Sequence, residues 1–287
     1  MKYFLVYLLV SFYSLNAWSI TVRDDIGHDV ALEKPAKRIV SLAPHITENL
    51  FAAGAGDQVV GVVEYSDYPE RAKNITSIGS YRSFNLEAIL ALNPDLVVAW
   101  RSGNGDAKIA QLKSLGLNVF VEEPRKIEDI AGSIRRFGAL AGHGAEAERT
   151  SQEFLRELNR LRKMYSNDAP VGVFYQVWND PLQTLNGNHL ISDVIRLCSG
   201  RNVFSEAKTL APHVSVEGVI AADPDVIVAS GMGENRPEWL DDWRPWDAIS
   251  AVRNGHLYFI NPDHLERHSA RILLGAEKMC QHLQRAR

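Results

Sequence analysis

Four histidines have positions from which a metal ion could be bound. His264 and His268 are four residues apart, and His45 and His213 lie near loops that should border a cleft. Zinc capture needs three or four nitrogen, oxygen or sulfur ligands that converge at about 2 Å. The pair His264 and His268 is expected in a loop before the last helix, and the sequence has no acidic, histidine-rich tract. We therefore expect polar cleft or surface histidines and no metal site.

The sequence lacks the residue patterns that are typical of catalytic sites. Gly54-Ala55-Gly56 lacks the third glycine of a dinucleotide fingerprint and follows an expected helix, where glycine commonly ends the helix. No Gly-x-Ser-x-Gly elbow is present. The carboxylates of Asp241 and Asp242 lie in a polar, tryptophan-rich stretch that is expected to be a solvated loop. The sequence therefore predicts a protein that is not an enzyme and that has no cofactor.

The first 19 residues have the three parts of a secretory signal peptide. Lys2 precedes an apolar run over residues 3–13, and the small residues Ala17 and Ser19 stand at the −3 and −1 positions of the expected cleavage site. The run is too short to span a bilayer, which takes about 20 apolar residues. No cysteine stands at the cleavage point, so no lipid anchor is expected there. The alternative is a buried N-terminal strand, but we expect residues 1–19 to be a signal peptide.

Two cysteines, Cys198 and Cys280, are present in the chain. An even number of cysteines in an exported protein favours a disulfide, although sequence alone does not supply its geometry. The bridge would join the last helix to its own part of the fold, and the absence of a Cys-x-x-Cys motif indicates a structural role. The alternative is two buried free thiols.

The composition is that of a globular protein, with 46% hydrophobic and 23% charged residues. Asp and Glu number 35 and Lys and Arg 31, so the formal net charge is −4. Nucleic-acid binding requires a basic face. We therefore expect no nucleic-acid partner.

Short β-branched runs alternate with helical patterns along most of the chain. The strands are expected at residues 38–42, 59–64, 95–100, 118–122, 171–177, 225–230 and 256–260. The helices are expected at residues 47–53, 86–92, 107–115, 127–140, 190–197, 216–222 and 270–284. This alternation predicts an α/β fold with mostly parallel sheets.

One stretch of the sequence occurs twice, 130 positions apart. Residues 85–99 align without a gap with residues 215–229. Each copy reads as a polar cap, a helix, a Pro-Asp turn and an apolar strand. Any unit of this kind looks similar, but Glu87 and Glu217 also share one helical position. The repeat therefore indicates two Rossmann-like lobes of the same topology.

A long amphipathic helix is expected between the two copies. Residues 145–165 contain no Pro or Gly, and Phe154, Leu158, Leu161 and Tyr165 form one stripe. Such a helix would be roughly 30 Å long. The chain is thus divided into an N-terminal lobe (20–143), a connecting helix (144–166) and a C-terminal lobe (167–287). A rigid connector limits lobe closure and predicts a ligand cleft between the lobes.

Several local motifs accompany this organisation. They are Arg38-Ile39-Val40-Ser41-Leu42-Ala43-Pro44 with Thr47-Glu48, Tyr65-Ser66-Asp67-Tyr68-Pro69, Asn85-Leu86-Glu87, Ala99-Trp100-Arg101-Ser102-Gly103-Asn104, and Asp263 with Glu266-Arg267, Ser269 and Arg271. With them the chain resembles the helical-backbone class of bacterial substrate-binding proteins, which serve importers of siderophores, haem and cobalamin. The resemblance extends over nearly all of residues 20–287 and is strongest to the cobalamin-binding members. It implies a periplasmic protein, monomeric when free, that passes vitamin B12 or a related corrinoid to the permease of an ABC importer in the inner membrane.

The resemblance also assigns roles to residues. Those at positions that line the corrinoid cleft are Tyr65, Tyr81, Trp100, Trp178, Asp263 and Arg267. Glu87 and Glu217 match paired glutamates that dock onto arginines of the permease, and Cys198 and Cys280 match a disulfide pair. A corrin is a large disc with amide arms and needs aromatic walls with a few polar groups. For the two glutamates, the alternative is that each only offsets its helix dipole.

The chain departs from the cobalamin-binding members at two aromatic positions, which here hold Ala211 and His264. Haem binding is the main alternative, with Tyr81 or His213 as the axial ligand. Ferric siderophores are a further alternative. They are usually bound by Arg or Lys clusters, and the residues assigned to the cleft are not basic as a group.

Overall fold

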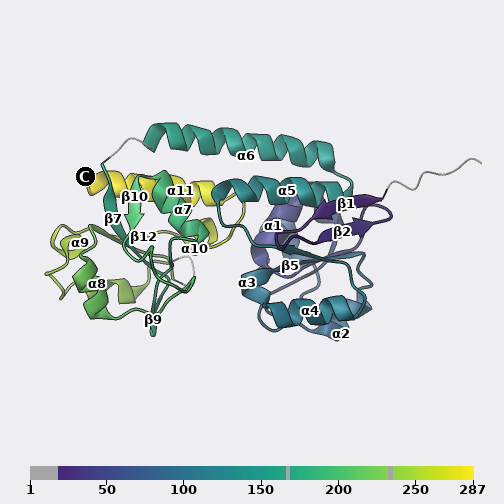
Figure 1. Ribbon diagram of the computed structural model, residues 1–287, viewed down its shortest axis with the longest axis horizontal. Helices are drawn as coiled ribbons and strands as arrows, with labels where there is room; N and C mark the ends of the chain where they lie inside the picture. Colours follow the sequence, from purple (N-terminus) through teal and green to yellow (C-terminus); the bar gives the residue numbers. More distant parts are fainter. Residues whose placement is uncertain (1–18, 166–168, 232–234) are drawn as a thin grey trace, which may run out of the picture.

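The computed structural model describes residues 19–165, 169–231 and 235–287. Figure 1 shows two lobes side by side beneath one long helix. Each lobe is built on a four-stranded parallel sheet. The expected signal peptide lies, except for Ser19, outside the described residues. In the described ranges, no helix has both the length and the apolar character needed to cross a membrane. The predicted two-lobed α/β architecture is confirmed.

The N-terminal lobe is built on the sheet β4-β3-β5-β6. Its strands are β3 (Ile39–Ser41), β4 (Val59–Val62), β5 (Leu96–Trp100) and β6 (Val119–Glu122). Its helices are α1 (Pro44–Ala52), α2 (Leu86–Ala91), α3 (Arg101–Asn104), α4 (Asp106–Ser114) and α5 (Ile127–Ala141), with 3-10 turns η1 (Gly56–Gln58) and η2 (Glu70–Asn74). An antiparallel hairpin of β1 (Ile20–Arg23) and β2 (Asp29–Leu32) was not among the expected strands.

The C-terminal lobe is built on the sheet β10-β7-β11-β12. Its strands are β7 (Val171–Gln176), β10 (Gly200–Asn202), β11 (Val226–Ala229) and β12 (Leu257–Phe259), with a small hairpin of β8 (Trp178–Asn179) and β9 (Leu182–Gln183). Its helices are α7 (Leu190–Leu197), α8 (Val216–Ala222), α9 (Ser250–Arg253), α10 (Pro262–Leu265) and α11 (Ile272–Arg285), with a 3-10 helix η3 (Glu238–Trp243).

The continuously apolar strands are buried on both faces. In β5, Leu96 and Val98 face a core that includes residues of α1 and α5, whereas Val97 and Ala99 face a second core with α2 and α4. In β11, alternate residues likewise divide between a core with α7 and α11 and a core with α8 and α9. Because successive side chains of a strand point to opposite faces, a strand covered on both sides needs apolar residues throughout.

The sequence repeat is a structural repeat. Helices α2 and α8 begin 130 positions apart, and so do strands β5 and β11. Between helix and strand, Asn93 and Asp223 are also 130 positions apart, and both have left-handed backbone, with φ of 43° and 38°. Asn and Asp tolerate this conformation better than other residues with a side chain. The turn geometry therefore depends on the same residue chemistry in both lobes.

The Pro-Asp turns tie each repeat to the neighbouring strand. The Asp95 carboxylate accepts a hydrogen bond of 3.0 Å from the Arg38 amide, just before β3. The Asp225 carboxylate accepts one of 2.7 Å from the Gly172 amide, at the start of β7. Each aspartate thus accepts a hydrogen bond from a backbone amide at the amino end of an inner strand. The bond fixes the alignment of this strand with its parallel neighbour.

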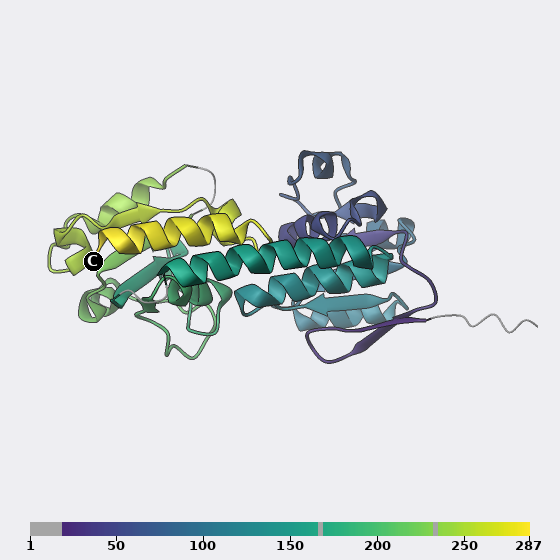
Figure 2. The same cartoon turned by 90° about the horizontal axis from the view of Figure 1, so that it is seen from above.

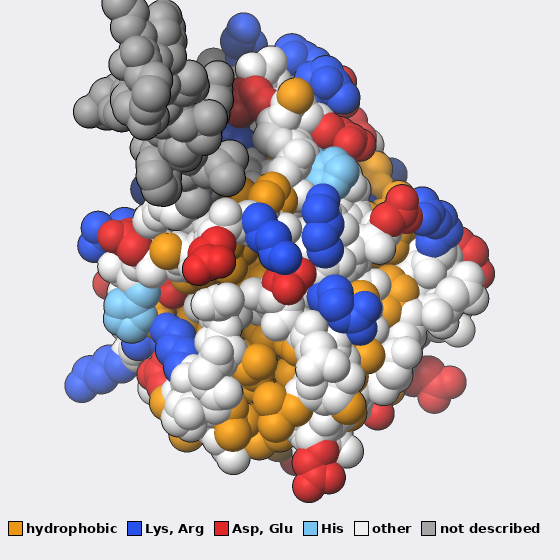
Figure 3. All heavy atoms as spheres, turned by 90° about the vertical axis from the view of Figure 1, so that its right-hand side faces the viewer, with side chains coloured by type: hydrophobic (Ala, Val, Ile, Leu, Met, Phe, Trp, Pro, Cys, Tyr) orange, Lys and Arg blue, Asp and Glu red, His pale blue; other side chains and the backbone are white. Residues whose placement is uncertain are grey.

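Helix α6 (Gly144–Tyr165) joins the lobes and runs along both of them (Figure 2). It packs on α5 of the N-terminal lobe and on α7 and α11 of the C-terminal lobe. The predicted stripe of Phe154, Leu158, Leu161 and Tyr165 is buried, and it belongs to a single apolar core that contains residues of both lobes. The outer end of the N-terminal lobe shows acidic and basic side chains around an area of hydrophobic side chains in the lower middle of its visible face (Figure 3).

Cys198 and Cys280 form a disulfide whose Cα atoms are 4.7 Å apart. Both cysteines are buried. Cys198 follows α7 and Cys280 lies in α11, so the bridge joins two helices that cover the same face of the C-terminal sheet. The predicted pairing, and its place within one lobe, are confirmed.

Replacement of Cys198 and Cys280 with Ala should lower the free energy of unfolding by about 2–4 kcal/mol, because the bridge closes a long loop of the unfolded chain. Urea denaturation of the parent protein and the double variant, each with and without reductant, would measure this loss. Reductant should destabilise the parent and leave the variant unchanged. An equal unfolding midpoint for oxidised and reduced parent would contradict the expected stabilisation.

Candidate functional site

The candidate site lies where the carboxyl ends of strands from both sheets approach the junction of the lobes. Trp100 ends β5 and Glu122 ends β6 in the N-terminal lobe. In the C-terminal lobe, the segment after β12 contains α10 and leads to α11. Ligands of open α/β sheets bind beyond the carboxyl ends of the strands. The two sheets therefore direct their ligand-binding edges to one region.

Aromatic rings from both lobes form a cluster at this junction. The Tyr81 and Trp100 rings lie 5.9 Å apart. On its other side, Trp100 packs edge-on against His45 at 5.1 Å and against His268 of the C-terminal lobe at 5.7 Å. His268 also lies 5.4 Å from His189, the N-cap residue of α7. We call Tyr81, Trp100, His45, His268 and His189 the ring cluster. In this cluster, imidazoles from both lobes pack against the predicted cleft residue Trp100.

The surroundings of His189 and His268, the two ring-cluster histidines of the C-terminal lobe, favour their neutral form. Burial, together with the positive charge of Arg125, lowers the pKa of His189 to about 4. Burial and the neighbouring His45 and His189 lower the pKa of His268 well below its usual range. His45 Nε2 lies 2.8 Å from the buried carboxylate of Glu122. Among the described residues, no three His, Cys, Asp or Glu side chains are grouped so that they could hold a metal ion.

A buried glutamate of the N-terminal lobe binds two arginines of the C-terminal lobe. Glu48, on α1, accepts hydrogen bonds from Arg271 Nε at 2.9 Å and Arg271 Nη2 at 2.6 Å, and from Arg267 Nη1 at 3.0 Å. Ser269 Oγ donates a further hydrogen bond of 2.6 Å to Glu48. The Glu48 side chain is only 3% exposed. Because each donor belongs to the other lobe, these bonds fix the position of one lobe against the other.

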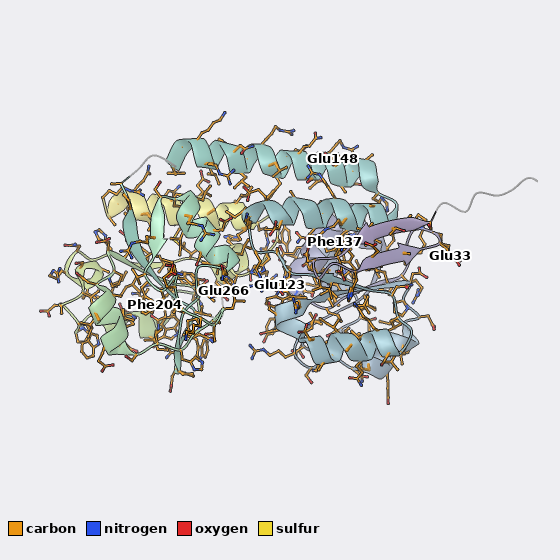
Figure 4. The ribbon with its side chains drawn as sticks, in the orientation of Figure 1. Glu33, Glu123, Phe137, Glu148, Phe204 and Glu266 are labelled. Atoms are coloured by element: carbon orange, nitrogen blue, oxygen red, sulfur yellow. A yellow bond between two sulfur atoms is a disulfide. The ribbon has the colours of Figure 1, made fainter. Side chains whose placement is uncertain are left out.

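Two more carboxylates complete this ion network. Arg267 contacts Asp67 at 2.6 Å and Asp263 at 2.9 Å. Burial alone would lower the pKa of Arg267, but its hydrogen bonds to Asp67 and Glu48 raise it. Burial alone would likewise raise the pKa of Asp67, and the hydrogen bond from Arg267 lowers it. We call Glu48, Asp67, Asp263, Arg267 and Arg271 the interlobe clasp. Glu266, which precedes Arg267, is labelled near the middle of the molecule in Figure 4.

The structure brings some of the predicted ligand-binding residues together and leaves others apart. Tyr81 and Trp100 are neighbours in the ring cluster, and Asp263 and Arg267 are neighbours in the clasp. Tyr65 is 75% exposed, with left-handed backbone at a φ of 64°. A bulky residue in this conformation is strained and contributes no packing here, which is a feature of binding loops.

Trp178 lies on the small hairpin of the C-terminal lobe. Its indole N–H donates to the Asp180 carbonyl at 2.9 Å. Among the described residues, no ring contact joins Trp178 to the ring cluster. The structure therefore gives Trp178 a local hydrogen bond and a place outside the cluster, and its role in ligand binding remains a prediction.

The expected solvated loop around Asp241 and Asp242 is wrong. This stretch forms η3, and Trp243 within it is buried, with its indole N–H donating to Gln176 Oε1 at 2.6 Å. Trp239, Trp243 and Trp246 also line a pocket of about 180 Å³. The sequence did not predict the burial of Trp243, because its neighbours are polar. A short 3-10 helix also lacks the apolar stripe by which an amphipathic α-helix is recognised. The signal that could have revealed this helix was the tryptophan that recurs among the acidic residues 238–243.

The glutamates of the repeat have equivalent positions. Glu87 and Glu217 are the second residues of α2 and α8 and are exposed. Each helix begins with a side-chain cap, in which Asn85 accepts from the Ala88 amide and Ser215 from the Gly218 amide, both at 3.1 Å. Hydrogen bonds from its own amide and from Ser215 lower the pKa of Glu217. Figure 1 shows α2 and α8 on the side of the molecule opposite α6.

Comparisons with known proteins agree with this arrangement. The profile of a family described as "Periplasmic binding protein" matches residues 39–264. The vitamin B12-binding protein of Vibrio cholerae serotype O1 is 36% identical over 250 residues, which cover 87% of this chain and 90% of that protein. The crystal structure of the periplasmic vitamin B12 binding protein BtuF of Vibrio cholerae has a TM-score of 0.82 at 35% identity, covering 88% of this chain and 98% of the other. The apo structure of the periplasmic heme-binding protein RhuT from Roseiflexus sp. RS-1 has a TM-score of 0.77 at 26% identity, covering 88% and 100%.

Replacement of Glu48 with Gln should lower the free energy of unfolding by about 3 kcal/mol. The variant removes the central charge of a buried ion network and leaves two arginines facing an uncharged amide. Thermal and urea unfolding would measure the loss. Glu128→Gln is the matched control, because Glu128 pairs with Arg162 at a half-exposed position and its loss should cost at most about 1 kcal/mol. Equal losses in the two variants would show that the clasp does not hold the lobes together.

Proposed function

This chain belongs to the periplasmic binding protein family, and we propose that it captures vitamin B12 or a related corrinoid between its lobes and delivers it to an ABC importer of the inner membrane. The observation that carries this proposal is the Tyr81–Trp100 pair at the junction of the lobes, in a chain that is 36% identical to a vitamin B12-binding protein. The same likeness supports a periplasmic location and a binding protein in place of an enzyme.

The chemistry of the junction suits a corrinoid. A corrin is a broad, partly apolar disc whose rim carries neutral amide arms, so aromatic faces and a few polar groups are what it requires. The ring cluster supplies the faces, and the exposed Tyr65 ring lies on a loop of the same lobe. The buried indole N–H of Trp100 has no hydrogen-bond partner among the described residues. Such a donor is costly to bury without a partner, which marks the surroundings of Trp100 as an unusual place in the core.

Haem is the second candidate ligand, since a heme-binding protein shares the fold at 26% identity. An axial ligand from this chain would be Tyr81 or His213. Tyr81 packs against Trp100, whereas His213 is exposed and forms an isolated bridge with Gln183 of its own lobe. Because the Tyr81 ring packs against Trp100, it is placed to contact a flat ligand through its face. This arrangement suits a corrinoid better than haem, which would need the Tyr81 oxygen as a ligand of iron.

Glu87 and Glu217 are proposed as the docking points for the permease. Their carboxylates are exposed at equivalent positions of the two lobes, on helices opposite α6. Guanidinium groups bind carboxylates through paired hydrogen bonds. Two arginines of the permease could therefore bind Glu87 of one lobe and Glu217 of the other at the same time. Because α6 and the shared core join the lobes, the spacing of these two carboxylates is fixed by the fold.

Replacement of Trp100 with Ala should weaken cyanocobalamin binding by about 1–3 kcal/mol, the scale for truncation of a buried aromatic contact. Calorimetric and absorbance titrations with cyanocobalamin and haemin would measure it. Trp100→Phe is the control and should recover most of the affinity, since it keeps a ring over His45. A Soret shift with haemin in the parent protein, without heat from any corrinoid, would move the assignment to haem.

The variant Glu87→Gln with Glu217→Gln should bind cyanocobalamin normally and fail in uptake, because the permease reads charge at these positions and the ligand does not contact them. Each single variant should show a partial loss. The control is Glu33→Gln with Glu153→Gln, which removes two exposed carboxylates from other faces. A purely structural role at the helix termini would instead lower the unfolding temperature slightly in each variant. Full uptake by the double variant would exclude the docking role.

A further inference from the structure

The two lobes line a pocket of about 500 Å³ at their junction. The N-terminal lobe supplies two residues from the turn between β6 and α5, and the C-terminal lobe supplies the rest. The lining residues are Arg125, Lys126, Asn186, Gly187, Asn188, Arg196, Lys208 and Leu210. Four of these eight are cationic and none is acidic, so we call this the interlobe basic pocket.

The acids beside the pocket do not balance its positive charge. Arg125 contacts Glu123 at 3.2 Å and Arg196 contacts Asp193 at 3.0 Å. These pairs neutralise two of the four cations, and the Asp129 carboxylate, which accepts hydrogen bonds from the Arg125 and Lys126 amides, adds one more acid. The Lys208 ammonium has no hydrogen-bond or ion-pair partner within the described ranges. The pocket lining has no acid of its own, and the small excess of positive charge that its two lysines leave favours an anionic ligand group.

The positive potential of the pocket reaches the ring cluster. The charge of Arg125 is among the causes that lower the pKa of His189 and the pKa of His268, after burial itself. A charge that acts on these imidazoles is not fully screened by solvent. An anion in the pocket would therefore be attracted by Arg125 through the protein interior as well as through solvent.

The pocket adjoins the proposed ligand site. Asn186 and Asn188 of its lining immediately precede His189, which lies 5.4 Å from His268. His268 in turn lies 5.7 Å from Trp100. The rings therefore form a continuous path from the proposed aromatic wall to the basic lining. The basic lining and the proposed aromatic wall are therefore both at the junction of the lobes, with the buried rings of His189 and His268 between them.

We propose that the interlobe basic pocket binds the phosphodiester group of the corrinoid ligand, an inference that rests on the proposed function. The corrin amide arms are neutral, whereas the phosphodiester that links them to the lower base carries a full negative charge at neutral pH. Lysine, arginine and asparagine side chains donate the hydrogen bonds that phosphate oxygens accept. These cations lie outside the motifs that suggested the cleft residues, so no sequence pattern indicated them.

Three corrinoids allow the contributions of the phosphate and of the lower base to binding to be measured separately. Cyanocobalamin carries both phosphate and lower base, cobinamide phosphate carries the phosphate without the nucleoside, and cobinamide carries neither. The variant Lys126→Ala with Lys208→Ala should weaken binding of the first two by about 5- to 10-fold, the scale for the loss of two exposed charge contacts. Its affinity for cobinamide should change less than about twofold. Calorimetric titration of the exported protein would measure all three.

The matched control is Lys34→Ala with Lys163→Ala, which removes the same charge at exposed sites away from the pocket. It should bind all three corrinoids as the parent does. Equal losses for the three ligands in the pocket variant, or a loss for cyanocobalamin alone, would overturn the assignment to the phosphodiester. A parent protein that binds no corrinoid at all would overturn the proposed function and this inference together, and the parent titration shows that result before any variant is compared.

Discussion

The constraint on which the rest of the structure depends is the apolar core that both lobes share. Helix α6 presents one buried stripe to α5 in the first lobe and to α7 and α11 in the second. Any large rotation of one lobe would have to expose part of this stripe, at roughly 25 cal/mol per Å². The lobes are therefore held close to one relative position, and a ligand meets a site that is largely formed before binding.

The junction beneath this core is divided electrostatically. On one side lies the interlobe clasp, in which three carboxylates surround two arginines. On the other lies the interlobe basic pocket, with its four cations. Between them, burial keeps His189 and His268 neutral. A neutral, ring-lined centre suits an apolar disc, while charged side chains remain available at its edges for polar substituents of the ligand.

The elements of the fold were predictable and the clasp was not. Most strands and helices of both lobes followed from apolar periodicity, and the repeat indicated their topology, because each depends on neighbouring residues. Strand β10 of the C-terminal sheet was not expected, because Gly200–Asn202 is short and polar. Glu48 and Arg267 are 219 positions apart in the sequence, and no local pattern pairs two residues at such a distance. Glu48 could have been noticed as an acid within an apolar helix. The hairpin β1–β2 was missed because its strands are short and only alternately buried.

Under the proposed function, the repeat separates the surface for the permease from the site for the ligand. The duplicated segment includes α2 and α8, whose glutamates share one face. The ring cluster and the clasp draw on segments that the repeat does not include, such as the loop after β4 and the segment between α10 and α11. Duplicated elements thus keep a symmetric outer face, which suits a permease with equivalent subunits. The segments outside the repeat are free to differ between lobes, and an asymmetric ligand requires that difference.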